Sequence, residues 1–506
     1  MLSTIPSDSA IPEGTVILIH TEGTVRPIAI VLFTFSICVA WAQPDAARSY
    51  RPNIPKTWDN QAVRTMELPL VGLGETATHI SGDEYYRLPI RKIYRSYPVY
   101  HPNREPSGYQ QWLKNQEPVS EFDLSKLKTE PDWIKAGEKI FHGGSDLATS
   151  AEANFVNSRS AERFQAAAIP VAADGTVPFW RYIVREKGKI ELAMGCAECH
   201  TRVLPDGTVV SGAQGNLPAM WIVGQNRRRR RDREPDALPQ ILMRDFVRAS
   251  VPWLHPDPAE NLKHASWDEV IGTTEQRIAG LANRVGTNPH FAPKTPNLIR
   301  VRDRRYLDAT GLIKHRSIGD LMRYAALVSG VDELARYGVY RPMGDSPDLP
   351  RQRFSDEQLY ALALYVYSLT PPPNPNKPSP ESRRGEEIFR REGCASCHTP
   401  PVYTNNQIIP VSVIKTDSRL TTQTRKGTGY YRVPSLRGVW YSGPFEHNGS
   451  VAALEDWFDP ARLRDDYVPT GFVGYGLKAR AVKGHEFGLK LSPEDKSALI
   501  AFLRTL

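Results

Sequence analysis

Residues 196–200 (CAECH) and residues 394–398 (CASCH) decide how this 506-residue chain is built. Each string is a C-x-x-C-H site, in which two cysteine sulfurs form thioether bonds to one haem and the adjacent histidine becomes the proximal ligand of its iron. The sequence therefore predicts two covalently bound haems c. The residues that would hold them are Cys196, Cys199, His200, Cys394, Cys397 and His398.

The composition argues against a coincidental match. The chain holds only 5 cysteines and 12 histidines, so random placement makes even one such string rare. A zinc site is the alternative interpretation, but each string offers three ligands at best and no clear fourth ligand stands nearby. We therefore expect haem rather than zinc at both strings.

The N-terminal segment is expected to direct export. Residues 28–39 form an apolar run that contains Cys38 and is too short for a hydrocarbon core, which needs roughly 20 residues. Residues 40–42 (AWA) match the pattern that signal peptidase cleaves. We therefore expect a signal peptide region at 1–42 and a periplasmic or secreted product with no stable membrane span. An uncleaved membrane anchor is the alternative. No disulfide is expected. Residues 1–24 carry acidic and no Lys or Arg side chains, unlike a signal sequence, so they are expected not to belong to the natural product.

The net charge and the clustering of arginines give some indication of the binding partners of the protein. The formal net charge is +8, and five consecutive arginines occupy residues 227–231. An exported cytochrome meets no nucleic acid, so we interpret this run as a solvated loop, with docking to an acidic electron donor as the alternative. The expected partners are a small redox protein of the cytochrome c or cupredoxin type and a small oxidant or organic substrate.

The chain also repeats itself. Residues 137–141 (GEKIF) recur as 385–389 (GEEIF), and residues 355–369 (SDEQLYALALYVYSL) recur as 492–506 (SPEDKSALIAFLRTL). The later pair is typical of amphipathic helices that begin at a capping serine. Their apolar faces are expected to pack on the helices of the earlier pair, as in class I cytochromes c. This self-similarity predicts a duplicated haem module.

The predicted fold is mainly α, with two tandem class I cytochrome c-like haem domains, long loops and an irregular N-terminal extension. Between the repeats, Pro296 returns as Pro434. The first module holds an insertion of about fifty residues before its haem string. The expected boundaries are a Pro-rich N-terminal extension at 43–130, an N-terminal haem domain at 131–370, a linker at 371–380 and a C-terminal haem domain at 381–506.

A family resemblance rests on the second half. Residues 433–438 (VPSLRG), residues 443–451 (GPFEHNGSV) and residues 454–455 (LE) resemble the C-terminal signature of the bacterial di-haem cytochrome c peroxidase superfamily, which includes MauG-like enzymes and rubber oxygenases. The likeness covers residues 131–506. In that family the sixth ligand of the C-terminal haem comes from the segment before the closing helix and is methionine, tyrosine or histidine. His485 stands there, so the resemblance implies that it is the distal ligand.

The two haems are expected to differ. An iron bound by His398 and His485 would have no open coordination position and would relay electrons. The same register in the first module points to Asp348, a poor ligand, with Met220 and Met343 as alternatives. The N-terminal haem is therefore expected to be five-coordinate or water-bound, free to take peroxide or dioxygen.

The resemblance also implies a distal acid–base set of glutamine, proline and glutamate. Here Arg323 or Tyr324 stands at the glutamine position and the proline position falls near Val328, so Glu333 is the one candidate catalytic residue. The alternative is that Arg323 and Tyr324 face solvent on a helix. This departure puts efficient peroxide reduction in doubt.

Some further residues complete the sequence predictions. Arg432 and Arg437 are candidates for pairing with haem propionates, and residues 440–441 could lie near the path between the haems. The family also implies a Ca²⁺ ion held by carbonyl groups near Ser442 and Pro444.

Three functions fit the sequence. The first is a peroxidase-like oxidoreductase with an active N-terminal haem supplied with electrons by the C-terminal haem. The second is a non-catalytic di-haem electron carrier. The third is an oxygenase that cleaves an apolar substrate with dioxygen, which the altered distal set and the large insertion favour.

Overall fold

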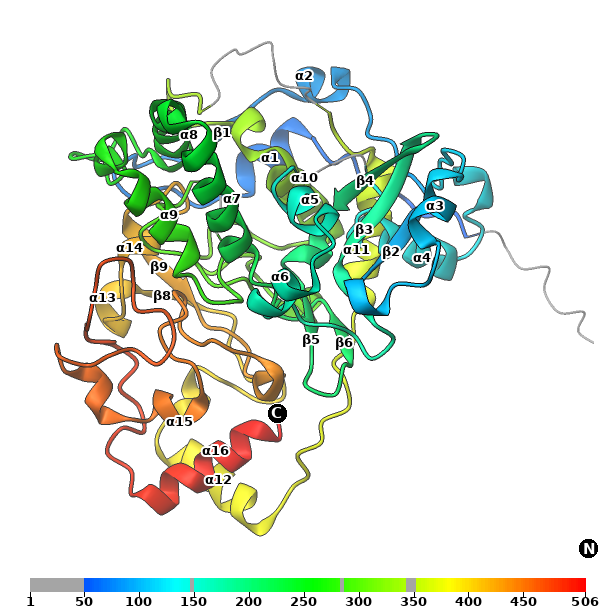
Figure 1. The fold of residues 1–506 in the computed structure, drawn as a ribbon. Helices are drawn as coiled ribbons and strands as arrows, with labels where there is room; N and C mark the ends of the chain where they lie inside the picture. The colour runs from blue at the N-terminus through cyan, green and yellow to red at the C-terminus, as the bar shows by residue number, and fades with distance from the viewer. Residues whose placement is uncertain (1–49, 146–149, 283–285, 343–351) are drawn as a thin grey trace, which may run out of the picture. The chain divides into compact units, whose positions relative to one another are not determined.

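The fold contains two pairs of crossing helices (Figure 1). The computed structural model describes residues 50–145, 150–282, 286–342 and 352–506. The helices of the pairs are α4 (Glu130–Phe141) with α11 (Asp356–Ser368) and α12 (Pro380–Arg391) with α16 (Pro493–Arg504). The pair α12 and α16, yellow and red in Figure 1, lies next to the end of the chain.

The closing helix of each pair begins at the serine that the repeat predicts. The Ser355 side chain accepts the backbone N–H of Gln358 in a capping box, and the Ser492 side chain accepts the N–H of Asp495. Such contacts satisfy donors that the first helical turn leaves without intrahelical partners. Both predicted N-caps are confirmed.

A glycine lies at the crossing point of each pair. A Cβ atom on Gly137 would overlap the carbonyl oxygen of Ala361, and a Cβ atom on Gly385 would overlap that of Ala498. Ala361 and Ala498 occupy matching positions of the sequence repeat. The predicted packing of the closing helices on the opening helices is therefore confirmed. The same close contact, between a glycine and an alanine carbonyl group, is formed within each pair.

The chain is mainly helical, and its strands form small sheets. Inside the insertion, β3 (Thr176–Glu186) and β4 (Lys189–Met194) form an antiparallel hairpin, and β2 (Ser96–Tyr100) pairs with the other edge of β3. Phe179 and Trp180 of β3 are completely buried. The sequence analysis did not predict this sheet, which joins the N-terminal extension to the insertion.

The remaining elements connect these parts. The helices are α1 (Asn60–Thr65), α2 (Gly82–Arg87), α3 (Tyr109–Lys114), α5 (Ser150–Asn157), α6 (Ala161–Ala166), α7 (Ala219–Arg233), α8 (Leu238–Ala249), α9 (Trp267–Glu275), α10 (Ile318–Leu334), α13 (Val411–Ile414), α14 (Arg419–Thr422) and α15 (Leu454–Trp457). Antiparallel pairs join β1 (Thr78–His79) to β7 (Ala335–Arg336), β5 (Thr201–Val203) to β6 (Val209–Ser211), and β8 (Ile408–Pro410) to β9 (Tyr430–Arg432).

The compact part of the chain runs from Ser49 to Leu506, and the predicted domain boundaries within it stay predictions. The predicted signal region at 1–42 lies outside the described residues. Within the described ranges, no helix has both the length and the apolar character that crossing a membrane requires.

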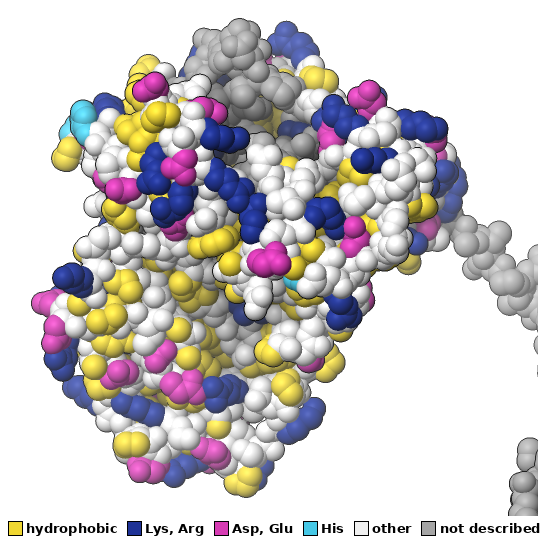
Figure 2. Space-filling view, viewed as in Figure 1, with side chains coloured by type: hydrophobic (Ala, Val, Ile, Leu, Met, Phe, Trp, Pro, Cys, Tyr) yellow, Lys and Arg dark blue, Asp and Glu magenta, His cyan; other side chains and the backbone are white. Residues whose placement is uncertain are grey.

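The arginine run at residues 227–231 lies in helix α7, so its interpretation as a solvated loop is wrong. Arg227 is 8% exposed and pairs with Asp245 of α8 over 2.6 Å. Arg228 pairs with Glu275 of α9 over 2.5 Å. Figure 2 shows acidic side chains interspersed among the basic ones in this region. The partners come from neighbouring helices, so the run itself gave no sign of them.

Candidate functional site

Each predicted proximal histidine is oriented by the carbonyl group of a proline. Nδ1 of His200 lies 2.9 Å from the oxygen of Pro296, and Nδ1 of His398 lies 3.1 Å from the oxygen of Pro434. A ring whose Nδ1–H donates in this way is left with Nε2 as a metal ligand. Pro296 and Pro434 match in the repeat, so both halves build the proximal side alike.

The four cysteines of the two strings are free of disulfides. Burial raises the pKa of the Cys196 thiol to about 11 and that of the Cys394 thiol to about 11 as well. Both groups are therefore protonated thiols near neutral pH, which is the form that adds across a vinyl group.

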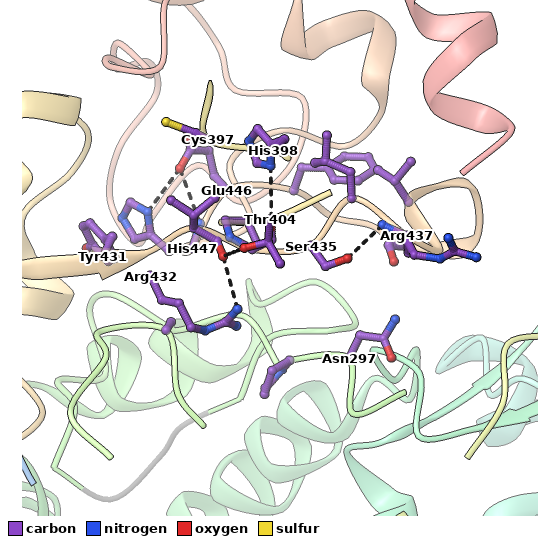
Figure 3. A pocket seen from close by; sticks show the side chains of 18 of the residues that line it. Asn297, Cys397, His398, Thr404, Tyr431, Arg432, Ser435, Arg437, Glu446 and His447 are labelled. Carbon is purple, nitrogen blue, oxygen red and sulfur yellow. Dashed lines mark hydrogen bonds and ion pairs between the residues drawn. The ribbon is translucent and has the colours of Figure 1, made fainter. Parts of the chain in front are cut away.

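A cavity of ≈ 410 Å³ adjoins the second string (Figure 3). Cys394, Cys397 and His398 line it together with His485. Its wall carries six cationic side chains, Lys294, Arg300, Arg304, Lys426, Arg432 and Arg437, and three anionic ones, Asp303, Asp308 and Glu446. This excess of positive charge suits a group that carries carboxylates, as haem does in its two propionates. The donor set and the charge of the cavity both fit a haem c.

His485 faces His398 across this cavity. The ring centroids lie 6.2 Å apart. Two imidazoles on opposite sides of one metal ion would be separated by about 6 Å, because each bond to nitrogen is about 2 Å long and the ring centre lies about 1 Å farther out. Burial lowers the pKa of His398 to about 4 and also lowers the pKa of His485, so both rings are in the neutral, metal-binding form.

Arg462 holds the loop that presents His485. The φ angle of His485 is 48°, in the left-handed region that a residue with a side chain occupies at a cost. Arg462 is 1% exposed and donates to the carbonyl oxygens of Trp457, Val482, Gly484 and His485 over 2.6–3.0 Å. The indole Nε1 of Trp457 also donates to Nδ1 of His485 over 3.3 Å.

Arg462 and Trp457 are positioning residues that the sequence analysis missed. Trp457 comes two residues after the LE element of the family signature, and Arg462 comes five residues later. Their proximity to that element was the available signal. A lone arginine in a loop gave no indication of its four carbonyl partners.

Replacing Arg462 with methionine is expected to lower the free energy of unfolding by about 2–4 kcal/mol, because buried carbonyl groups lose their donors. Part of the C-terminal haem should also change from low spin to high spin, because the backbone of His485 is released. Chemical denaturation and electron paramagnetic resonance (EPR) spectra of the holoprotein measure the two effects. Arg464→Met is the control, since the exposed Arg464 pairs with Asp466 at the surface. Indistinguishable behaviour of the two variants would contradict the positioning role.

The structure gives less about the predicted residues near the first string. The Met220 sulfur accepts from Nη1 of Arg277 over 3.4 Å. Met343 and Asp348 lie outside the described residues. The backbone of Glu333 belongs to the end of α10, but its side chain lies outside the described part of the structure. Its catalytic role stays a prediction.

Arg323 does not face solvent, so that alternative is wrong for this residue. It is 5% exposed and pairs with Asp320 over 2.8 Å. It also donates to the carbonyl oxygen of Thr57 over 3.4 Å. Arg323 therefore anchors the N-terminal extension on α10. Of the other residues at the altered distal positions, Tyr324 is half-buried and Val328 is 52% exposed.

The two arginines predicted to pair with propionates both line the cavity. Nε of Arg432 donates to the carbonyl oxygen of Asp308 over 3.1 Å, and Nη1 of Arg437 donates to that of Pro401 over 3.0 Å. These contacts fix each guanidinium at the wall and leave further N–H groups on each for an anion.

The predicted calcium position is occupied by donors from the first half. Nε2 of Gln214 donates to the carbonyl oxygen of Pro444 over 3.1 Å, and Arg202 donates to that of Gly443. A guanidinium beside these carbonyl groups repels a divalent cation. The contacts near Ser442 therefore disfavour Ca²⁺ at this place and join the two halves of the chain instead.

Comparison with known proteins gives distant matches. No family model matches the chain. Cytochrome-c peroxidase IdrP2 of Denitromonas iodatirespirans is 27% identical over 25% of this chain and 39% of its own length. Uncharacterized protein y4iJ of Sinorhizobium fredii is 34% identical over 15% of this chain and 18% of its own length. The chain thus spans well under half the length of these two curated relatives.

Two solved structures are similar over about half of this chain. Hydrazine synthase of Kuenenia stuttgartiensis has a TM-score of 0.31 and 16% identity over 53% of this chain and 87% of its own. A MauG-like protein associated with microbial copper homeostasis has a TM-score of 0.30 and 15% identity over 53% of this chain and 88% of its own.

Proposed function

We propose that this chain is a member of the bacterial di-haem cytochrome c peroxidase superfamily, an exported peroxidase-like oxidoreductase with two unequal haems c. The first haem would be attached by Cys196 and Cys199, and the second by Cys394 and Cys397. The observation that carries the proposal is the histidine that faces the second string, His485; in the sequence repeat the matching position of the first half is Asp348, a poor haem ligand.

The second site is proposed to relay electrons. His398 and His485, with ring centroids 6.2 Å apart, would occupy both axial positions of one iron and leave none for a substrate. Arg462 would keep His485 in place through the carbonyl contacts of its loop. A site closed in this way is suited to taking electrons from a small redox protein and passing them on.

The first site is proposed to bind the oxidant. A haem iron with an open axial position supplies the place where a small oxidant such as hydrogen peroxide or dioxygen is reduced. The carbonyl of Pro296 orients His200 on the proximal side. Other histidines of this half have partners elsewhere, such as His290 with Glu269 over 2.8 Å and His315 with Tyr367 over 2.6 Å. Glu333 is proposed to move protons beside the oxidant.

The proposed organisation follows the repeat. Residues 131–370 and residues 381–506 would each form a class I cytochrome c-like domain, a proposal that the matching glycine contacts at Gly137 and Gly385 support. The leader at 1–42 would direct the chain to the periplasm or out of the cell.

Spectra of the holoprotein with and without cyanide test this proposal. The ferric protein should give a high-spin EPR signal from the first site and a low-spin signal from the second. Cyanide should convert only the high-spin signal, and hydrogen peroxide should change the optical spectrum and be consumed when a reduced small cytochrome is supplied. One low-spin population that responds to neither reagent would overturn the proposal and favour an electron carrier.

A further inference from the structure

Arg304 lies between the two predicted haem sites and has contacts toward each. It follows the short 3₁₀ helix Val301–Asp303 and lines the cavity that contains His398. Its Nη2 donates to the carbonyl oxygen of Asn297. Its Nη1 is buried, and within the described part of the chain it has no hydrogen-bond partner.

On one side, Arg304 donates to the carbonyl group that follows, by one residue, the carbonyl group that orients His200. Asn297 directly follows Pro296, whose carbonyl accepts the Nδ1–H of His200 over 2.9 Å. The guanidinium and the first proximal ring are therefore joined by two hydrogen bonds and the intervening backbone. The Asn297 side chain also donates to the hydroxyl of Tyr441 over 3.2 Å, which ties the same peptide to the second half. Figure 3 shows Asn297 and His398 on different walls of the cavity.

On the other side, Arg304 has a charged N–H group, Nη1, that finds no hydrogen-bond acceptor within the described residues. Burial and the nearby Arg432 together lower the pKa of Arg304 to about 9, and the group remains protonated near pH 7. A buried cation without an anionic partner is unfavourable. Guanidinium groups bind carboxylates through paired N–H donors, and a haem in this cavity carries two carboxylates.

We infer that Arg304 is a positioning residue that joins the propionate edge of the C-terminal haem to the Pro296–Asn297 peptide behind His200, and so provides a bonded route for electrons between the haems. The inference rests on the proposed function of two unequal haems. When both haems are bound, one electron would pass along this route, so that the C-terminal haem would be oxidised and the N-terminal haem reduced. Arg304 makes and breaks no covalent bond and transfers no proton.

Two substitutions distinguish the effect of the hydrogen bonds of Arg304 from the effect of its positive charge. Arg304→Lys keeps the positive charge but removes the fork that donates to Asn297 and to a carboxylate together. Arg304→Met removes both. Arg305→Met is the matched control, because Arg305 is the next residue along the chain and its side chain is exposed.

The experiment measures electron transfer between the haems in the half-reduced holoprotein, after carbon monoxide is photodissociated from the N-terminal haem. We expect Arg304→Lys and Arg304→Met to slow the transfer severalfold, and Arg305→Met to leave the rate unchanged. Spectroelectrochemistry should show a lower C-terminal potential in Arg304→Met than in Arg304→Lys, because only the methionine variant loses the charge. The haem content of each variant, measured as the pyridine haemochrome, shows that both haems are in place.

The outcomes separate this inference from the proposed function. If both Arg304 variants transfer electrons at the wild-type rate with two haems bound, the bridge is wrong while the proposed function stands. If the wild-type protein binds no carbon monoxide at either haem, the proposed function fails and the role of Arg304 fails with it. A loss of rate equal in Arg305→Met and Arg304→Met would also overturn the inference, because the effect would then come from the loss of any positive charge in this segment.

Discussion

Replacing His485 with alanine is expected to convert the second haem from low spin to high spin. His485 lies with its ring 6.2 Å from that of His398, and in the part of the chain that the structure describes no other histidine ring contacts His398. Without the imidazole, one axial position of that iron opens. The EPR spectrum should lose its low-spin signal, and cyanide should now bind at both haems.

A second substitution at the same position tests the chemistry of the ligand. His485→Met offers a thioether, which favours the reduced iron, so the midpoint potential of the second haem should rise. Glu486→Gln is the matched control, because Glu486 is exposed on the same loop and should leave both spectra unchanged. An unaltered low-spin signal in His485→Ala would show that another group ligates this iron.

The elements that the sequence predicted well are those with short-range or repeated signals. Ser355 and Ser492 were predicted as N-caps because a capping serine and the apolar pattern after it are local. The packing of each closing helix on an opening helix was predicted because residues 137–141 recur as residues 385–389. The position of Pro434 behind His398 is likewise the counterpart of Pro296 behind His200.

The elements that the sequence did not predict depend on contacts between distant segments. Strand β2 lies in the N-terminal extension and pairs with β3 of the insertion, where Tyr97 is opposite Tyr182. Neither segment indicates its partner, because the pairing is set by burial of one shared face. The interpretation of the arginine run as a solvated loop was wrong for the same reason. Its ion-pair partners Asp245 and Glu275 belong to helices that follow it in the chain.

The candidate site shows the same division. His485 could be predicted from its register before the closing helix, because that segment resembles the family signature. The role of Arg462 could not be predicted, because it depends on carbonyl groups of residues distant in the sequence, such as His485. Arg304 could not either, since it precedes the second string by many residues and meets its cavity only in the folded chain.

Replacing Gly385 with alanine is expected to lower the free energy of unfolding by about 3 kcal/mol or more. The added Cβ would overlap the carbonyl oxygen of Ala498, and a backbone atom in the middle of α16 cannot move aside as a flexible side chain can. The two helices must separate, which exposes Phe389 and Phe502 between them. Urea denaturation followed by far-ultraviolet circular dichroism measures the loss. Glu387→Ala is the control, because Glu387 is exposed two residues farther along α12.

The corresponding change in the first half turns this stability prediction into a test of the duplicated modules. Gly137→Ala places a Cβ against the carbonyl oxygen of Ala361, so it should destabilise α4 and α11 as Gly385→Ala destabilises α12 and α16. If the halves unfold as separate units, each variant should lower the midpoint of only one transition. The spin state of the corresponding haem identifies which transition moved. A stability of Gly385→Ala equal to that of Glu387→Ala would contradict the crossing geometry, because no packing change elsewhere could absorb a clash between two backbones.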